Sequence, residues 1–240
     1  MDDTIENLCE AWCAALNVRY GTLVTPHDIK EWDLRKSFPG LTTEEIYAPL
    51  KDDAFWDTVK PIPGAPEALR SLSEDGHRLL IVTASHPETV SAKLNKVLFR
   101  YFPFLTYKDV VVASQKDVIR GDVRIDDNPD NLTLVNDGSL RILFNRPHNE
   151  SFNADAHNIE RADDWNEIEA MVSLYSYMNA GRTKPRDRYV GVEELYHKTV
   201  EVGQGSPMFH IGETIRFSPS EIYDIAKTIA VNEIPEKSED

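Results

Sequence analysis

Short, almost entirely apolar segments alternate with amphipathic segments through the middle of the chain. Apolar runs at 78–84, 109–113, 123–127 and 140–145 predict four strands. An amphipathic stretch at 87–102 predicts a helix between the first two strands. Strands that are apolar on both faces are typical of parallel sheets covered by helices. The pattern therefore predicts an α/β fold.

Residues 5–60 carry helical rather than strand patterns and many aromatic side chains. Apolar residues recur with helical spacing from Ile5 onward, and Thr25 and Pro26 fit the N-cap and first position of a second helix. We expect this second helix to run through Trp32 and a third to cover 41–50. These residues are therefore predicted to form a small helical unit.

Further elements follow from the same reasoning. A Pro- and Gly-containing loop at the end of the helical unit leads into an amphipathic helix that stops at Gly76. The remaining predicted elements are a helical turn in 128–137, helices at 163–180, 192–202 and 218–229, and a strand at 208–217.

Charge and hydropathy exclude several classes of partner. The 240 residues carry a formal net charge of −15, whereas binding to a nucleic acid polymer is driven mainly by Lys and Arg. No apolar run approaches the length of a membrane span, and the N-terminus lacks the pattern of a secretory signal. We therefore expect a cytoplasmic protein with neither a nucleic acid polymer nor a membrane as its partner.

Two cysteines, Cys9 and Cys13, lie four residues apart beside the apolar stripe of the first predicted helix. This spacing is neither that of a CxxC motif nor that of a disulfide framework. We interpret both as buried structural thiols.

Polar residues follow the predicted strands at their carboxyl ends, where parallel sheets bind their ligands. Thr83, with the backbone N–H groups of the turn that begins at Ala84, suits a phosphate oxygen. Lys116 adds a positive charge, and Asp126 and Asp127 are adjacent acids that a hard cation such as Mg²⁺ would compensate. Each residue alone fits a helix cap, a solvated lysine or a turn, but their order on successive strands favours one site.

The motif series resembles a known family. Met1-Asp2-Asp3-Thr4, IVT ending at Thr83, Lys116 and GDVRIDD at 121–127 resemble, in order, the four motifs of the haloacid dehalogenase-like phosphatases. FWDTVKPIPGAPEALRSL, KDVIRGDVRIDDNPDN and LFNRPHN are similar to stretches of the 5′(3′)-deoxyribonucleotidases. The resemblance covers about residues 1–175.

The resemblance implies a Rossmann-like parallel sheet with helices on both faces and a small helical cap. The core would comprise 1–4 and 61–180, the cap 5–60, and an extension of unknown role 181–240. The family's first motif is DxDx[TV], so its nucleophilic Asp, with the strand that carries it, would fall just before Met1. Two alternatives stay open: the coding sequence starts upstream of Met1, which we favour, or the protein lacks the nucleophile.

The implied activity is Mg²⁺-dependent hydrolysis of (deoxy)nucleoside monophosphates through an aspartyl-phosphate. Asp2 would be the general acid/base and would offer its backbone carbonyl to Mg²⁺. Asp127, supported by Asp126, would also bind the cation, while Thr83 and Lys116 would hold the phosphoryl oxygens. A binding module without turnover is the alternative function.

Aromatic residues of the cap are candidates for contact with the nucleobase. They are Trp32, Phe55 and Trp56, and aromatic faces stack on bases in many nucleotide sites. The alternative is that they form the small core of the cap. A homodimer is a further partner that the sequence leaves open.

Overall fold

The computed structural model describes residues 1–135 and 137–179. The chain divides into two compact units, residues 1–166 and 167–240, and the elements that build the candidate site belong to the first. Helix α7 (Trp165–Asn179) agrees with the helix expected at 163–180. The elements predicted at 192–202, 208–217 and 218–229 lie outside the described residues.

The strands are short and all their pairings are parallel. β1 (Ile81–Thr83) pairs with β2 (Val110–Val112), and β4 (Leu140–Phe144) pairs with both β3 (Val123–Asp126) and β5 (Glu160–Ala162). The predicted parallel α/β fold is confirmed. The sequence did not predict β5, because its Glu-Arg-Ala sequence lacks the apolar character of the other four strands.

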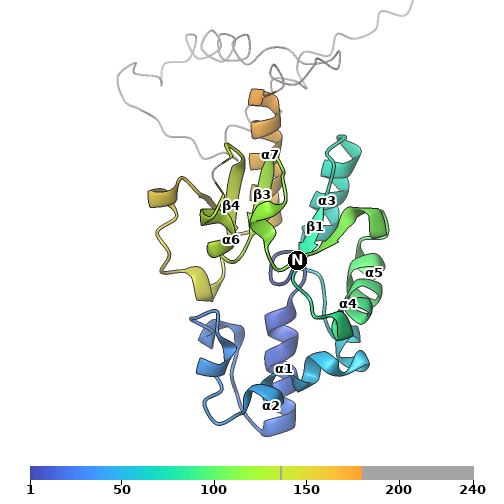
Figure 1. Cartoon of the computed structure of the whole chain (residues 1–240), viewed down its shortest axis with the longest axis vertical. Coiled ribbons are helices and arrows are strands. Elements are labelled where there is room, and N and C mark those ends of the chain that lie inside the picture. Colours follow the sequence, from blue (N-terminus) through green and yellow to red (C-terminus); the bar gives the residue numbers. More distant parts are fainter. Residues whose placement is uncertain (136, 180–240) are drawn as a thin grey trace, which may run out of the picture. The chain divides into compact units, whose positions relative to one another are not determined.

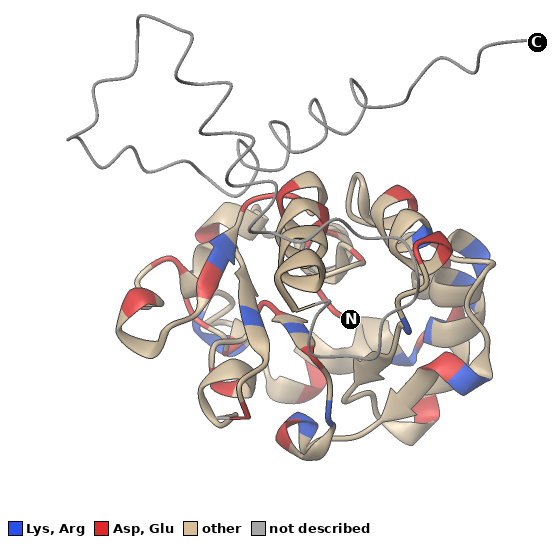
Figure 2. Ribbon diagram, turned by 90° about the horizontal axis from the view of Figure 1, so that it is seen from above, with Lys and Arg blue, Asp and Glu red and all other residues tan. Residues whose placement is uncertain are grey.

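The two parallel sheets are separate. Within the described residues, no ladder joins β1 to β3, and Figure 1 shows the N-terminus between these two strands. In the perpendicular view of Figure 2, the N-terminus again lies among the surrounding helices and strands. Met1 is only 6% exposed, and its carbonyl accepts hydrogen bonds from the backbone of Thr4 and Ile5 at 3.3 and 3.0 Å. The first residues therefore form a buried turn.

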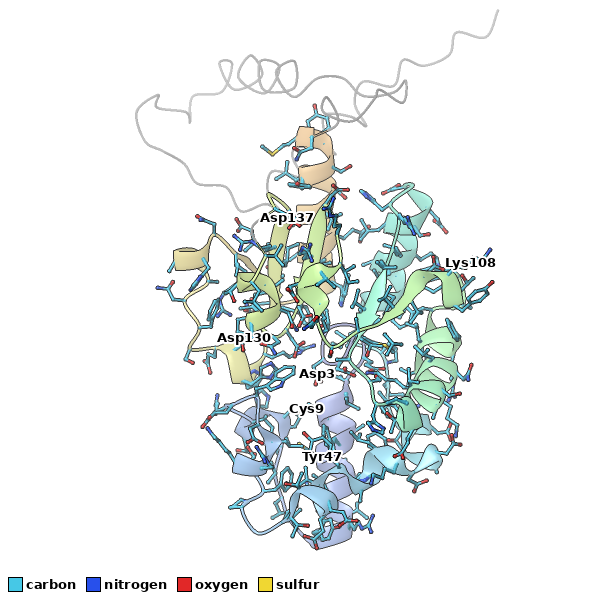
Figure 3. All side chains as sticks on the ribbon, viewed as in Figure 1. Asp3, Cys9, Tyr47, Lys108, Asp130 and Asp137 are labelled. Atoms are coloured by element: carbon cyan, nitrogen blue, oxygen red, sulfur yellow. The ribbon has the colours of Figure 1, made fainter. Side chains whose placement is uncertain are left out.

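Residues 5–60 form a helical insertion between this turn and the strands (Figure 1). Its first helix, α1, ends at Gly21 in the left-handed conformation that glycine adopts without strain. Asp3 caps the start of α1, because its carboxylate accepts the Cys9 N–H at 2.9 Å; Figure 3 labels both residues. In chain order the elements are α1 (Leu8–Tyr20), η1 (Pro26–Asp28), η2 (Leu34–Lys36), α2 (Thr43–Tyr47), η3 (Ala48–Lys51) and η4 (Asp53–Asp57).

The helix expected to run from Pro26 through Trp32 was wrong in its length. It is the single 3₁₀ turn η1, which stops at Asp28. The Asp28 carboxylate accepts hydrogen bonds from the backbone and hydroxyl of Thr25, at 2.8 and 2.6 Å. Ile29 then leaves the helical conformation with ψ of 87°. Trp32 consequently lies in a loop.

The helical insertion has a hydrophobic cluster of its own. Cys13 is buried in this cluster and Cys9 packs against it half-buried; both thiols are free, as expected of structural cysteines. The other buried members are Leu16, Ile29, Leu34, Phe38 and Ile46.

The two chain segments that connect the insertion to the rest of the unit lie next to each other in space. The Asn7 N–H donates to the carbonyl of Lys60 at 2.8 Å, and the Ile62 N–H donates to the carbonyl of Ile5 at 3.0 Å. The entering and leaving segments are thus hydrogen-bonded to each other.

Helices follow the strands as the pattern predicted. The helix expected at 87–102 consists of α4 (Pro87–Lys93), the π-helical turn η5 (Leu94–Leu98) and α5 (Phe99–Tyr101), so the π turn starts directly after Lys93. Among the described helices, none is long and apolar enough to cross a membrane. The remaining elements are α3 (Ala65–Glu74), η6 (Tyr107–Asp109), η7 (Lys116–Val118), α6 (Asp130–Thr133), η8 (Pro147–Asn149) and η9 (Asp155–His157).

Candidate active site

The polar ends of β1 and β3 converge on the buried N-terminal turn. Thr4 lies at the centre, because its hydroxyl oxygen is 3.2 Å from the backbone carbonyl of Asp2 and 3.3 Å from the Asp127 carboxylate. The Asp2 carbonyl and the Asp127 carboxylate, which the sequence predicted to hold a cation, therefore both lie close to the Thr4 hydroxyl group. The Trp165 indole N–H fixes the turn by donating to the Thr4 carbonyl at 2.8 Å.

Asp127 is buried and held through its backbone. Asn149, itself buried, donates from one amide nitrogen to the carbonyls of Asp127 and Phe144, at 2.8 and 2.9 Å. The Asp127 Oδ2 atom has no hydrogen bond of good geometry among the described residues, although His148 Nε2 lies 3.1 Å away. A buried carboxylate oxygen that lacks a well-formed hydrogen bond is a suitable ligand for a cation.

Asp126 binds a lysine instead. Lys116 Nζ lies 2.8 Å from Asp126 Oδ2, while Oδ1 accepts the Asn128 N–H and the Asn131 amide, both at 3.0 Å. Burial alone would raise the pKa of Asp126, but the Lys116 ammonium group, the Met1 amine and the hydrogen bonds from Lys116 and Asn131 together lower it. The Lys116 ammonium group lies on Asp126 in the structure, and its contact with a phosphoryl oxygen stays a prediction.

A second lysine, which the sequence did not predict, lies at the site. Lys93 is 2% exposed; its ammonium group hydrogen-bonds to Asp2 and lies 3.1 Å from Thr83 Oγ1 and 3.2 Å from Glu6 Oε1. Burial would lower the pKa of Lys93, but Asp2 and Glu6 raise it. Lys93 thus remains charged, hydrogen-bonded to Asp2 and Thr83 and within ion-pair distance of Glu6.

The two carboxylates beside Lys93 respond in opposite directions. Burial would raise the pKa of Asp2, but the Lys93 ammonium group lowers it overall. Glu6 is 0% exposed, and burial raises its pKa to about 8 in spite of Lys93. At neutral pH the cluster therefore holds an ionised Asp2 and a largely protonated Glu6.

The α-amino group of Met1 lies among these charges. Burial lowers the pKa of this amine, and the Lys116 and Lys93 ammonium groups lower it further. The start of the turn therefore lies within the electrostatic influence of two lysines, opposed by that of Asp2 and Asp126.

The three aromatic candidates are in different environments. Phe55 and Trp56 are buried and pack edge to face at 5.3 Å, and the Trp56 N–H donates to the Leu50 carbonyl at 3.0 Å. Trp32 is 60% exposed and meets the ring of His148 edge to face at 5.3 Å. Burial favours a packing role for the first two, whereas Trp32 faces the site rim through His148. Ala84, which follows β1, is exposed.

Side chains alone do not complete a metal site in the part of the chain that the structure describes. It contains no group of three or more His, Cys, Asp or Glu residues that could hold a metal ion. Asp127 Oδ2 and the Asp2 carbonyl are nevertheless the hard oxygen donors that Mg²⁺ takes, and Mg²⁺ commonly keeps several water ligands. The residues present fit a partly hydrated Mg²⁺.

Comparison with known proteins gives consistent matches. Residues 1–178 match the family model described as 5′ nucleotidase, deoxy (Pyrimidine), cytosolic type C protein. The chain is 32% identical over 171 residues to a 5′(3′)-deoxyribonucleotidase of Clostridium acetobutylicum, covering 71% of this chain and 91% of the relative. It is 31% identical over 170 residues to a 5′(3′)-deoxyribonucleotidase of Bacillus subtilis, covering 70% and 93%.

Proposed function

Because this chain belongs to the NT5C family of 5′-nucleotidases, we propose that it hydrolyses deoxynucleoside monophosphates with Mg²⁺ through an aspartyl-phosphate. The observation that carries the proposal is the convergence of Asp2, Thr83, Lys93 and Asp127 around one buried turn. The relatives named as 5′(3′)-deoxyribonucleotidases support a deoxynucleotide substrate, and the family's cytosolic description supports a cytoplasmic location.

The phosphoryl group would bind between β1 and the N-terminal turn. Thr83 and the N–H groups of the turn after it would donate to phosphoryl oxygens, and Lys93 would supply the fixed positive charge. Lys93 bonds to Thr83 in the substrate-free site. An entering phosphoryl oxygen would therefore take the place of that contact and reach both groups at once.

The nucleophile would be an aspartate at the position before Met1, where the family's first motif has it. Support comes from electrostatics, because Lys116 and Lys93 both lower the pKa of the Met1 amine and positive charges of this kind would favour a carboxylate at the neighbouring position. The carboxylate would attack phosphorus, and the bond from phosphorus to the nucleoside oxygen would break. Because no ladder joins β1 to β3 within the described residues, a strand leading to that aspartate would pair between them.

Asp2 would act as the general acid and then as the general base. It would give a proton to the departing nucleoside oxygen, and afterwards take one from the water that attacks the aspartyl-phosphate. In the substrate-free site Lys93 keeps Asp2 ionised. A phosphoryl group that draws Lys93 away, and brings negative charge close, would raise the pKa of Asp2 and allow it to carry that proton.

Asp127 Oδ2 and the Asp2 carbonyl would hold Mg²⁺, with Asp126 and Lys116 supporting Asp127 from the neighbouring position. When bound, the cation would neutralise negative charge on the transferring phosphoryl group. The helical insertion would be the cap domain over this site. Trp32, the exposed member of the three aromatics, would stack on the base.

The test compares the 240-residue chain with a version extended by an apolar strand that ends in Asp before Met1. We expect the extended protein to release phosphate from deoxynucleoside monophosphates with Mg²⁺ and to stop in EDTA. A matched extension ending in Asn is the control, and it should be inactive, as should the unextended chain. Activity that persists with the Asn extension would refute the proposed nucleophile, and activity that persists in EDTA would refute the metal.

A further inference from the structure

His148 lies beside the buried carboxylate of Asp127. It belongs to the turn η8, which follows β4, and its side chain is 10% exposed. Its Nε2 atom is 3.1 Å from Asp127 Oδ2 and 3.3 Å from the Asp127 carbonyl oxygen. With Asn149 holding the same carbonyl at 2.8 Å, the η8 turn controls where Asp127 sits.

The same imidazole ring is in contact with the helical insertion. The Trp32 ring meets it at 5.3 Å and an interplanar angle of 79°, the edge-to-face arrangement that aromatic pairs prefer. Two residues away on each side, Lys30 and Glu150 form an exposed ion pair at 3.0 Å. The loop that carries Trp32 therefore touches the η8 turn at two successive places.

The insertion can lose these contacts without losing its attachment. Its covalent connections are the paired segments at Asn7 and Lys60, far along the chain from Trp32. A displacement of the loop that carries Trp32 would separate its ring from His148, while Phe55 and Trp56 stay packed against Val97. The imidazole would then keep Asp127 as a neighbour but lose the ring that packs against its other side.

We propose that His148 is a positioning residue that holds the Asp127 carboxylate for the cation and makes cation binding depend on the contact with Trp32. The inference rests on the proposed role of Asp127 in binding the metal. Trp32 then serves the site in two ways, as a surface for the base and as the support of a histidine that orients a metal ligand. Residues that orient metal ligands from behind typically change metal affinity 10- to 100-fold when replaced.

The test is binding of Mn²⁺, a paramagnetic substitute for Mg²⁺, to the 240-residue protein, measured by electron paramagnetic resonance and repeated in competition with Mg²⁺. We expect His148→Leu to weaken Mn²⁺ binding at least about 10-fold. His148→Gln, which keeps a donor toward Asp127, should recover part of the loss. His157→Leu, a change of an exposed histidine that stacks on Phe152, is the matched control and should leave the affinity unchanged.

The contribution of Trp32 is tested by a double-mutant cycle. Trp32→Leu should weaken Mn²⁺ binding about 2- to 10-fold, the range expected for loss of one aromatic pair. The same substitution should have no effect when residue 148 is already Leu. Equal effects in both backgrounds would show that Trp32 does not act through His148.

The outcomes separate this inference from the proposed function. Normal Mn²⁺ affinity in His148→Leu, together with loss of binding in Asp127→Asn, would refute the positioning role and leave the metal site intact. Absence of Mn²⁺ binding to the unchanged protein would refute both.

Discussion

Replacing Lys93 by methionine removes the only ammonium group that contacts Asp2 and Glu6 within the described residues. Methionine has a similar length and volume, so the substitution removes the charge without opening a large cavity. After the substitution, the carboxyl groups of Asp2 and Glu6 no longer have the Lys93 ammonium group as a partner. We expect a clear loss of folding stability.

The size of the loss follows from the environment of each acid. Glu6 is already largely protonated at neutral pH, since its pKa is raised to about 8, and it can remain neutral. Asp2 is the group left ionised and unpaired, and its side chain is 32% exposed. Removing one partner of a fully buried pair costs about 3–5 kcal/mol, and partial exposure of Asp2 places this case near the lower end, about 3 kcal/mol. For a unit of this size that corresponds to a fall in Tm of about 6–12 °C.

The assay is thermal unfolding followed by circular dichroism at pH 7, with urea unfolding as a second measurement. Lys96→Met is the matched control, because Lys96 lies three residues further along, in η5, and pairs with the exposed acids Asp53 and Asp57. We expect a much smaller change in this control. The double variant Lys93→Met with Asp2→Asn should recover most of the stability, because no unpaired carboxylate remains.

A Tm of Lys93→Met that matches the Lys96→Met control would refute this reasoning. So would a double variant that is less stable than Lys93→Met alone. Either result would mean that the lysine is not what compensates the charge of Asp2.

Three further predictions concern the same site. Glu6→Gln should gain stability relative to the unchanged protein as pH rises from about 5 to 8, and this difference in stability should stay constant above pH 8. The reason is that the unchanged protein loses the stability of its protonated Glu6 over this range, because folding raises the pKa of Glu6 from 4.5 to about 8, which corresponds to at most about 5 kcal/mol. Tm curves of the two proteins that run parallel across this pH range would contradict the prediction. In the protein extended with the nucleophile, Asp2→Asn should lower the rate of phosphate release about 10²- to 10⁴-fold, and a loss of a few-fold would remove Asp2 from acid/base catalysis. In the same protein, measured at saturating Mg²⁺, Trp32→Ala should raise KM for a deoxynucleotide but not for a small phosphoester, whereas Trp56→Ala, a core change, should affect both alike.

The first four strands were predictable from the sequence because each is a short, largely apolar run. The same logic predicted that Thr83 and Asp127 lie at one site, and contacts through Lys93, Asp2 and Thr4 connect them. The short β5 strand was not predictable, because its pairing with β4 depends on the backbone and not on an apolar pattern.

Lys93 shows why part of the site could not be predicted. A lysine in an amphipathic helix is usually on the solvated face, and no local pattern distinguishes Lys93 from Lys96 on the same helix. Its burial depends on Asp2 and Glu6, which lie far away in the sequence. Similarly, the aromatic spacing of the insertion could not separate Trp56, buried against its neighbours, from the exposed Trp32.

The hydrogen-bonded entry and exit of the helical insertion have a consequence for how such enzymes diversify. Because the Asn7 N–H and the Lys60 carbonyl are 2.8 Å apart, the core needs only a short bridge at this point, whatever the length of chain between them. The entropy of closing a loop rises only with the logarithm of its length, so insertions of very different size can be accommodated there at similar cost. Evolution, or a protein engineer, can therefore exchange the insertion, with its own hydrophobic cluster, while the residues around Thr4 keep their places.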